Sequence, residues 1–409
     1  MLNDLFTKAL GLLDPWRVDD VDFQTSQGNI TFRLRFDGKR AACPVCGLIE
    51  QPIHDRLERR WQHLNFFQYR AYLIAGLPRV ACQCGKTTQL EVPWANPRSG
   101  FTLLFEAYAL ALAQQLPVSE VAKMLGTNPQ PLWKRLVEMV LRAYDQESFA
   151  NLRHLTIDET AIRRGHDYVT VIADRVARKV VFVTEGKDAL TMGDFASELL
   201  SHGAKPAQVE SISMDFSAAF QLGAKQNFPD AKVHLDPFHL VALASEAVDA
   251  VRREEVKAEP TLRKQRYSLL KSESGWTAKQ AAFMAEFKDS HLKSARAWRI
   301  KEMVRDLVRM KADETTTRDG LQSIVNHAQR SRLAPVIRFG QTVRKHFEGI
   351  VSAIANRRSN GFAEGLNSLI QTARQRARGF KTAQNFIAII YLIAAKLQNL
   401  PKNPMAQAA

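Results

Sequence analysis

The fold of this chain is decided by two short apolar stretches, His154-Leu-Thr-Ile-Asp-Glu-Thr160 and Ile212-Ser-Met-Asp-Phe-Ser217. Each predicts a buried strand that carries an aspartate, Asp158 in the first and Asp215 in the second. Two buried carboxylates side by side repel each other, so they tend to need a cation between them. Oxygen ligands of this kind suit Mg²⁺ or Mn²⁺. The alternative is that each aspartate merely ends a strand and caps a turn.

The residues between these stretches predict the rest of a sheet. Residues 168–174 and 179–184 are rich in β-branched side chains, which favour strands, and residues 191–202 predict a helix. Three hairpin-like strands, a helix and a further strand make a mixed sheet. In that order, the strands carrying Asp158 and Asp215 are central neighbours.

Two further candidate site residues, Asp236 and His239, come after the second aspartate. Residues 217–227 predict a helix, 231–236 a strand, and a further helix begins at Asp236-Pro-Phe-His239. Asp236 and His239 could support the acidic site without binding the cation themselves. Capping of the helix is the equally simple role for Asp236.

Composition and charge narrow the class of protein. The chain has 409 residues, is 45% hydrophobic and carries a net charge of +15. This size allows several domains. The charge favours a polyanionic partner, most often nucleic acid, and the alternative is a soluble protein that is basic without such a partner. The start of the chain lacks a basic secretory signal, and the longest apolar run, residues 386–395, is too short to span a bilayer. We therefore expect a cytoplasmic protein with no membrane partner.

The cysteines predict a structural zinc site. All four lie within the first 84 residues, as Cys43-Pro-Val-Cys46-Gly and Cys82-Gln-Cys84-Gly. In a reducing compartment this usage points to a metal rather than disulfides, and four thiolates in two pairs suit tetrahedral Zn²⁺. His54 could replace one thiolate, because the second pair is unusually tight. The alternative is four unrelated buried thiols.

A helix-turn-helix pattern follows a linker over residues 93–100. Residues 101–115 predict a helix, 118–126 a short helix with Ser119 as its cap, and 129–144 a basic second helix after a glycine turn. Within the last helix, we expect Gln130, Lys134 and Arg135 near DNA, with Trp133 either beside them or in the core. A plain helical hairpin is the alternative.

The carboxyl-terminal half is predominantly helical. Residues 240–351 predict an all-α insertion whose charge run could be only a solvated face. A later helix, capped by Ser359 or Asn360, places Phe362, Leu366, Leu369 and Ala373 on an apolar stripe and Glu364 on the opposite face. A glutamate there, with uncompensated cations after it, suits metal binding beside a phosphate backbone, although a lone glutamate is more often a surface residue. The basic residues expected to contact DNA are Arg357, Arg358, Arg374, Arg376, Arg378 and Lys381.

Taken together, these residues resemble those of DDE-type transposases of bacterial insertion sequences, specifically the ISL-three family. The resemblance covers most of the chain, and the stretch around Glu364 is its most specific mark. It rests on both cysteine pairs and on Thr156-Ile-Asp158-Glu, Arg163-Arg-Gly-His166, Ser213-Met-Asp215-Phe-Ser217, Asp236-Pro-Phe-His239 and Ser359-Asn-Gly-Phe-Ala-Glu364-Gly-Leu-Asn367.

The resemblance implies a ribonuclease-H-like core in which Asp158, Asp215 and Glu364 hold two divalent ions, Mg²⁺ or Mn²⁺. Such a site cleaves a phosphodiester and then joins the freed 3′-hydroxyl to another by in-line attack. It also implies that the zinc ribbon and helix-turn-helix bind terminal inverted repeats, while the basic surface binds flanking and target DNA. A homo-oligomer, a dimer on DNA, and association with the bacterial nucleoid are expected.

We therefore predict an α+β multidomain protein with a ribonuclease-H-like mixed-sheet core interrupted by an all-α insertion. One alternative is a related metal-dependent nuclease that cuts without joining, and another is a non-catalytic zinc-ribbon and helix-turn-helix regulator. The predicted domains are residues 1–97 (zinc ribbon), 98–147 (helix-turn-helix), 148–239 (first part of the core), 240–351 (insertion), 352–398 (second part of the core, with the Glu364 helix) and 399–409 (disordered tail).

Overall fold

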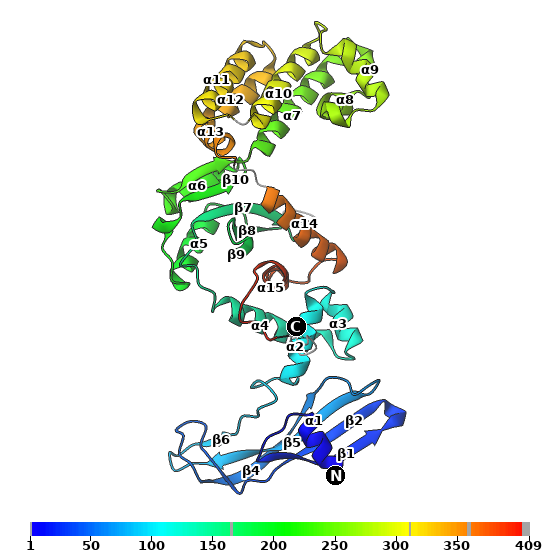
Figure 1. Cartoon of the computed structure of the whole chain (residues 1–409), viewed down its shortest axis with the longest axis vertical. Coiled ribbons are helices and arrows are strands. Elements are labelled where there is room, and N and C mark those ends of the chain that lie inside the picture. The colour runs from blue at the N-terminus through cyan, green and yellow to red at the C-terminus, as the bar shows by residue number, and fades with distance from the viewer. Residues whose placement is uncertain (1, 164–166, 311, 358–360, 403–409) are drawn as a thin grey trace. The chain divides into compact units, whose positions relative to one another are not determined.

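The computed structural model of the protein describes residues 2–163, 167–310, 312–357 and 361–402. The chain divides into two compact units (Figure 1). The first comprises Met1–Gln146, Ala373–Ile393 and Leu397–Ala409, and the second comprises Glu147–Thr372 and Ala394–Lys396.

The first unit is built on a six-stranded sheet of order β1-β2-β5-β4-β3, with β6 paired to β5. Strands β2 and β5 are parallel, and the other pairs are antiparallel. The strands are β1 (Trp16–Gln24), β2 (Asn29–Phe36), β3 (Arg40–Ala41), β4 (Gln51–Gln62), β5 (Arg70–Ala81) and β6 (Thr87–Gln89), preceded by α1 (Leu2–Ala9) and with a 3₁₀ turn at Thr25–Gln27.

Alternation along the strands gives this sheet one buried face. In β2, Phe32, Leu34 and Phe36 are buried, whereas Arg33 and Arg35 between them are exposed. The period of two sends successive side chains to opposite faces, so the apolar ones meet in a single core. Trp16, Trp61 and Trp94 close that core with edge-to-face ring contacts.

Three helices follow the sheet: α2 (Leu103–Ala113), α3 (Val118–Met124) and α4 (Pro129–Tyr144). The predicted bounds of α4 are confirmed, and the side chain of Asn128 caps it by accepting from the Gln130 N–H at 2.9 Å. The prediction that Ser119 caps α3 is wrong. The helix begins one residue earlier, at Val118, and Pro117 holds the cap position without a side-chain hydrogen bond.

The end of the chain returns to the first unit. Helix α15 (Ala383–Ala394) brings Tyr391 against Tyr144, with the two rings stacked 4.3 Å apart. Phe380 makes an edge contact with Trp133 at 6.1 Å, so the Trp133 ring takes part in packing within the first unit. The predicted second part of the core, residues 352–398, is therefore divided between the two units.

The second unit contains the predicted mixed sheet, five strands in the order β11-β10-β7-β8-β9. Strands β7, β8 and β9 are antiparallel neighbours, and β10 runs parallel to both β7 and β11. The strands are β7 (His154–Ala161), β8 (Tyr168–Asp174), β9 (Lys179–Glu185), β10 (Ser211–Met214) and β11 (Lys232–Leu235), with helices α5 (Leu190–Ser201) and α6 (Ala218–Asn227) and a 3₁₀ turn at Pro206–Gln208.

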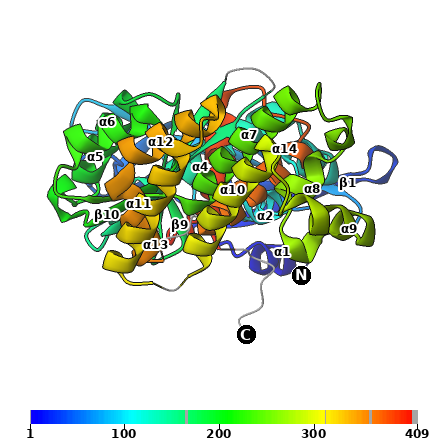
Figure 2. The same cartoon turned by 90° about the horizontal axis from the view of Figure 1, so that it is seen from above.

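Between β11 and the last helices, the described residues are helical and contain no strand, as predicted for the insertion. Helices α7, α10, α11 and α12 pack side by side (Figure 2). The elements are α7 (Pro237–Glu255), α8 (Arg266–Leu270), α9 (Ala278–Phe287), α10 (Lys293–Arg309), α11 (Glu314–Arg330), α12 (Ala334–Lys345), α13 (Phe347–Ala355) and α14 (Gly361–Arg376), with 3₁₀ turns at Pro260–Leu262 and Glu273–Gly275.

Candidate active site and zinc site

The four cysteines meet at one point of the first unit. Each pair forms a tight turn: the Gly47 N–H bonds to the Cys43 carbonyl at 2.9 Å, and the Gly85 N–H bonds to the Cys82 carbonyl at 3.0 Å. Both glycines have positive φ angles, 73° and 81°, which a residue with a side chain rarely adopts. These local turns aim the sulfurs at one another.

The cysteine geometry fits zinc. All four sulfurs lie within 4.8 Å of one another, and the Cys46 and Cys82 sulfurs are 3.4 Å apart. A tetrahedral site with Zn–S bonds of about 2.3 Å has sulfurs about 3.8 Å apart. Backbone N–H groups of Cys46 and Val45 lower the pKa of the Cys43 thiol to about 7, which favours the thiolate that binds metal. His54 is exposed and is not part of the cluster.

Asp158 lies on β7 of the second unit, and Asp215 directly follows β10, the parallel neighbour of β7. The register pairs Ser213 of β10 with Thr156 of β7, and each aspartate follows two residues later. Asp215 stands just beyond β10, where it accepts from the Ser217 N–H at 2.9 Å. Asp158 is inside β7, which continues to Ala161, so only Asp215 ends its strand.

The two aspartates and Glu159 form a patch of negative charge. Burial raises the pKa of Asp158, and the charge of Asp215 raises it further. Burial also raises the pKa of Glu159, with Asp215 and Asp158 adding to the effect while Lys187, 3.6 Å away, opposes it. Carboxylates whose charges act on one another favour a bound cation, and carboxylate oxygens are the ligand type that divalent metals such as Mg²⁺ prefer.

Helix α14 is bound to β7 through two amide side chains. Asn367 donates to Asp158 Oδ2 at 2.9 Å and to the Glu159 carbonyl at 3.2 Å. Gln371 donates to the Thr160 hydroxyl one turn later. The other Asp158 oxygen accepts from the Glu159 N–H at 2.8 Å, so both carboxylate oxygens of Asp158 are held in place.

The predicted apolar stripe of α14 is partly wrong. Ala363 and Ile370 are the buried residues, and they line a small internal space together with Thr156, Val171 and Ala173 of the sheet. Leu369, expected on the stripe, is 46% exposed. Since Asn367 and Gln371 face β7, the helix packs through a mixed apolar and amide face.

Glu364 lies one turn before Asn367 on the same helix, and its side chain is exposed. Residues three apart share a helix face, so Glu364 lies toward the side of α14 that meets Asp158. Among the described residues, only the cysteines form a group of three or more metal-ligating side chains within 4.8 Å of one another. The structure thus places Asp158, Asp215 and the Glu364 helix on neighbouring elements, but among the described residues the three carboxylates do not form such a cluster.

Asp236 and His239 occupy the start of α7. Asp236 is buried and caps the helix, accepting from the Phe238 N–H at 3.1 Å. His239 is half-buried, and its charge acts to lower the pKa of Asp158. A supporting role for His239 at the acidic site is thus compatible with its position.

The DNA-contact candidates fall into different environments. Gln130 and Lys134 are exposed on α4, but Arg135 is only 8% exposed because Glu106 binds it at 2.7 Å and Glu138 pairs with it. The Arg135 guanidinium is therefore held inside the fold by two carboxylates, and its contact with DNA stays a prediction. Arg357, Arg376, Arg378 and Lys381 are exposed and Arg374 is half-buried. Arg358, the capping candidates Ser359 and Asn360, and residues 164–166 of the Arg163–His166 motif lie outside the described residues.

Asn367 and Gln371 are predicted from the sequence to share the polar face of Glu364, but no role at the site is predicted for them or for Glu159 and Lys187. The signal for Asn367 and Gln371 was present in their helical spacing from Glu364, which puts all three on neighbouring positions of one face. Lys187 had no such signal, because it reaches Glu159 from the loop after β9.

A five-stranded mixed sheet with paired aspartates, preceded by a four-cysteine cluster and a helix-turn-helix, defines a DNA transposase of the DDE class. Three family descriptions match the chain: "Transposase" over residues 155–390, "Helix-turn-helix domain of transposase family ISL3" over 90–140, and "zinc-finger of transposase IS204/IS1001/IS1096/IS1165" over 39–85. The chain belongs to the ISL3 family of insertion-sequence transposases.

Relatives resemble the chain along nearly its whole length. It is 27% identical over 430 residues to "Transposase for insertion sequence element IS1557" of Mycobacterium tuberculosis, covering 96% of this chain and 95% of the relative. It is 24% identical over 397 residues to "Transposase for insertion sequence element IS1001" of Bordetella parapertussis, covering 94% and 97%.

The family and the cysteine cluster support a zinc ribbon, and the helix-turn-helix supports DNA binding. Within the described ranges, every helix is too short or too polar to cross a membrane.

Proposed function

We propose that the protein binds the terminal inverted repeats of its insertion sequence and catalyses metal-dependent cleavage and joining of DNA strands there. The observation that carries the proposal is the bond from Asn367 to Asp158, which ties the helix of Glu364 to the strand of Asp158, beside Asp215. Three acidic side chains on these elements are a suitable donor set for divalent cations that react with phosphodiesters.

The acidic residues would hold Mg²⁺ or Mn²⁺, which supplies charge neutralisation at the phosphate and lowers the pKa of a bound water. Asp158, fixed by Asn367 and by the Glu159 N–H, presents a carboxylate of set orientation. Asp215, Glu159 and Glu364 surround it with negative charge. The chain's own contribution is thus a rigid, negatively charged cradle next to the DNA backbone.

The first unit would deliver the DNA. The zinc ribbon is a structural element, since four cysteines leave a tetrahedral zinc no open position for chemistry. Helix α4 presents Gln130 and Lys134 at its amino-terminal half, the part of a recognition helix that reaches base edges. We also propose a homodimer on DNA, which mass photometry of the complex with an end duplex would reveal.

The test uses the full chain and a supercoiled plasmid that carries both ends of the element. With Mg²⁺ or Mn²⁺, breaks should form at the ends and joined products should follow, and a chelator should stop both. Breaks without joined products would favour the nuclease. End binding without any breaks, under conditions where the protein retains its metals, would favour the non-catalytic regulator.

A further inference from the structure

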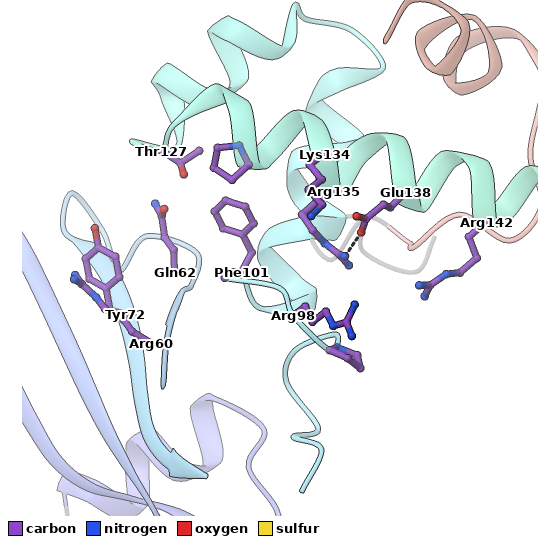
Figure 3. A pocket seen from close by; sticks show the side chains of 13 residues that line it. Arg60, Gln62, Tyr72, Arg98, Phe101, Thr127, Lys134, Arg135, Glu138 and Arg142 are labelled. Atoms are coloured by element: carbon purple, nitrogen blue, oxygen red, sulfur yellow. Dashed lines mark hydrogen bonds and ion pairs between the residues drawn. The ribbon is translucent and has the colours of Figure 1, made fainter. Parts of the chain in front are cut away.

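A basic groove lies in the first unit, between α4 and the end of β4 (Figure 3). Its volume is about 700 Å³. One wall comes from the sheet, a second from the linker before α2, and the third from α4. The side chains along these walls include Arg60, Gln62, Tyr72, Arg98, Phe101, Thr127, Lys134, Arg135, Glu138 and Arg142.

The groove has an excess of positive charge that the protein leaves unpaired. Its acidic residue, Glu138, is neutralised by Arg135 at the base of the groove. In the part of the chain that the structure describes, no carboxylate pairs with Arg60, Arg98, Lys134 or Arg142, and all four are exposed. Cations that line one groove without acidic partners repel one another, so the groove favours an anionic ligand.

The groove walls are fixed to one another. The Gln62 side chain donates to the Leu125 carbonyl at 2.9 Å, and its backbone N–H bonds to the Gly100 carbonyl at 2.8 Å. At the base, Glu106 holds Arg135 at 2.7 Å and accepts from Ser99 at 2.6 Å. These bonds connect the sheet, the linker and α4, so the backbone positions that carry the cations keep their spacing without a ligand.

The cations come from three walls of the groove rather than from one point. Lys134 and Arg142 are eight residues apart on α4 and share its solvent-facing side, a separation of about 12 Å. Arg60 stands on the opposite wall, its guanidinium 3.6 Å from the centre of the Tyr72 ring. A single small anion cannot contact charges so far apart, whereas a phosphate backbone can.

We propose that this groove binds the phosphate backbone of duplex DNA through Arg60, Arg98, Lys134 and Arg142. The zinc-ribbon sheet and the helix-turn-helix then act as one DNA-binding surface, in which the sheet and linker hold the backbone while Gln130 lies at the exposed start of α4. That the bound duplex is an element end rests on the proposed function; the phosphate binding itself does not.

The test measures affinity of the full chain for an end duplex and for an unrelated duplex of equal length, at several salt concentrations. Arg98→Ala with Arg142→Ala should weaken binding to both duplexes by similar factors, because phosphate contacts carry no sequence information. The slope of log affinity against log salt should become shallower by about 0.9 for each lost contact, about 1.8 for the double variant. Arg98→Lys with Arg142→Lys, which keeps both charges, should restore most of that slope.

Lys8→Ala with Arg33→Ala is the matched control, because it removes the same charge from exposed positions of the first unit that do not line the groove. Its slope should stay close to that of the unmodified chain. Equal slopes for the groove variant and this control, with both folded by circular dichroism, would overturn the groove proposal. Equal affinity of the unmodified chain for the end duplex and the unrelated duplex would instead overturn the proposed function. The salt slopes of the variants would still show whether the groove binds phosphate.

Discussion

The cysteine cluster and the proposed acidic site are both assembled from separate parts of the chain, yet only the cysteines form a closed ligand cluster. The four sulfurs lie within 4.8 Å of one another, whereas Asp158, Asp215 and Glu364 do not form such a cluster. Each cysteine pair is set by its own tight turn, and both turns adjoin strands of one sheet. The acidic residues come from two strands and a helix that follows a long insertion.

The two sets of residues differ in whether local turns or distant contacts place the side chains. In the zinc site, local turns aim the ligands, so the sheet has only to bring two turns together. In the acidic site, strand register places Asp158 beside Asp215, but Glu364 depends on how α14 lies on β7. Asn367 and Gln371 make that connection. We infer that Asn367, which contacts Asp158 itself, is a positioning residue for the third carboxylate.

The largest expected effect comes from neutralising the acidic site. Asp158→Asn, Asp215→Asn and Glu364→Gln keep side-chain size but remove the charge that a divalent ion needs. Each should abolish Mg²⁺- or Mn²⁺-dependent cleavage and joining in the plasmid assay, while DNA binding stays near normal. Asp194→Asn, on the exposed side of α5, is the control and should leave activity unchanged. Strand joining by the Asp215→Asn variant would contradict the assignment.

A large structural effect is expected at the cysteine cluster. The chain should contain about one zinc, measured by elemental analysis, and Cys43→Ser should lose it. Because binding of a structural zinc stabilises the fold, this variant should also unfold at lower temperature and bind end DNA less specifically. His54→Ala should keep its zinc, since His54 is exposed and outside the cluster. Freshly folded protein without zinc would contradict the assignment of the four cysteines as a zinc site.

A smaller effect is expected from Asn367. Removing an outer partner of a metal ligand costs about 10–100-fold in metal affinity or activity. Asn367→Ala should therefore weaken Mn²⁺ binding and cleavage by about that factor, and Asn367→Asp should do so more strongly because it sets a further carboxylate against Asp158. Ser368→Ala, the exposed neighbour on α14, should match the unmodified chain. Equal Mn²⁺ affinity in Asn367→Ala and Ser368→Ala would show that α14 is positioned by other contacts.

Much of the fold could be predicted from local sequence. Strands β7 to β11 and helix α4 follow from apolar runs, β-branched residues and turn signals, because these short-range patterns also decide burial. The neighbouring positions of Asp158 and Asp215 follow from strand order. Those features need no knowledge of distant contacts.

Features that depend on contacts between distant residues could not be predicted from the sequence. Arg135 reads as a solvent-facing cation of a DNA-binding helix, but Glu106, 29 residues away, binds it inside the fold. Lys301 lies in a charge-rich helix that predicts a solvated face. It is fully buried, its ammonium donates to the Leu269 carbonyl, and burial lowers its pKa to about 8. The partners of both residues are fixed only by tertiary packing.

The most direct test of the central claim, that Asp158, Asp215 and Glu364 share a divalent-metal site, is a Mn²⁺ titration of the zinc-loaded full chain followed by electron paramagnetic resonance. The unmodified chain should bind Mn²⁺, and Glu364→Gln should lose or greatly weaken that binding, as Asp158→Asn and Asp215→Asn do. Glu286→Gln, an exposed position of the insertion, should bind like the unmodified chain. Undiminished Mn²⁺ binding by Glu364→Gln, alongside loss in both aspartate variants, would contradict the shared site.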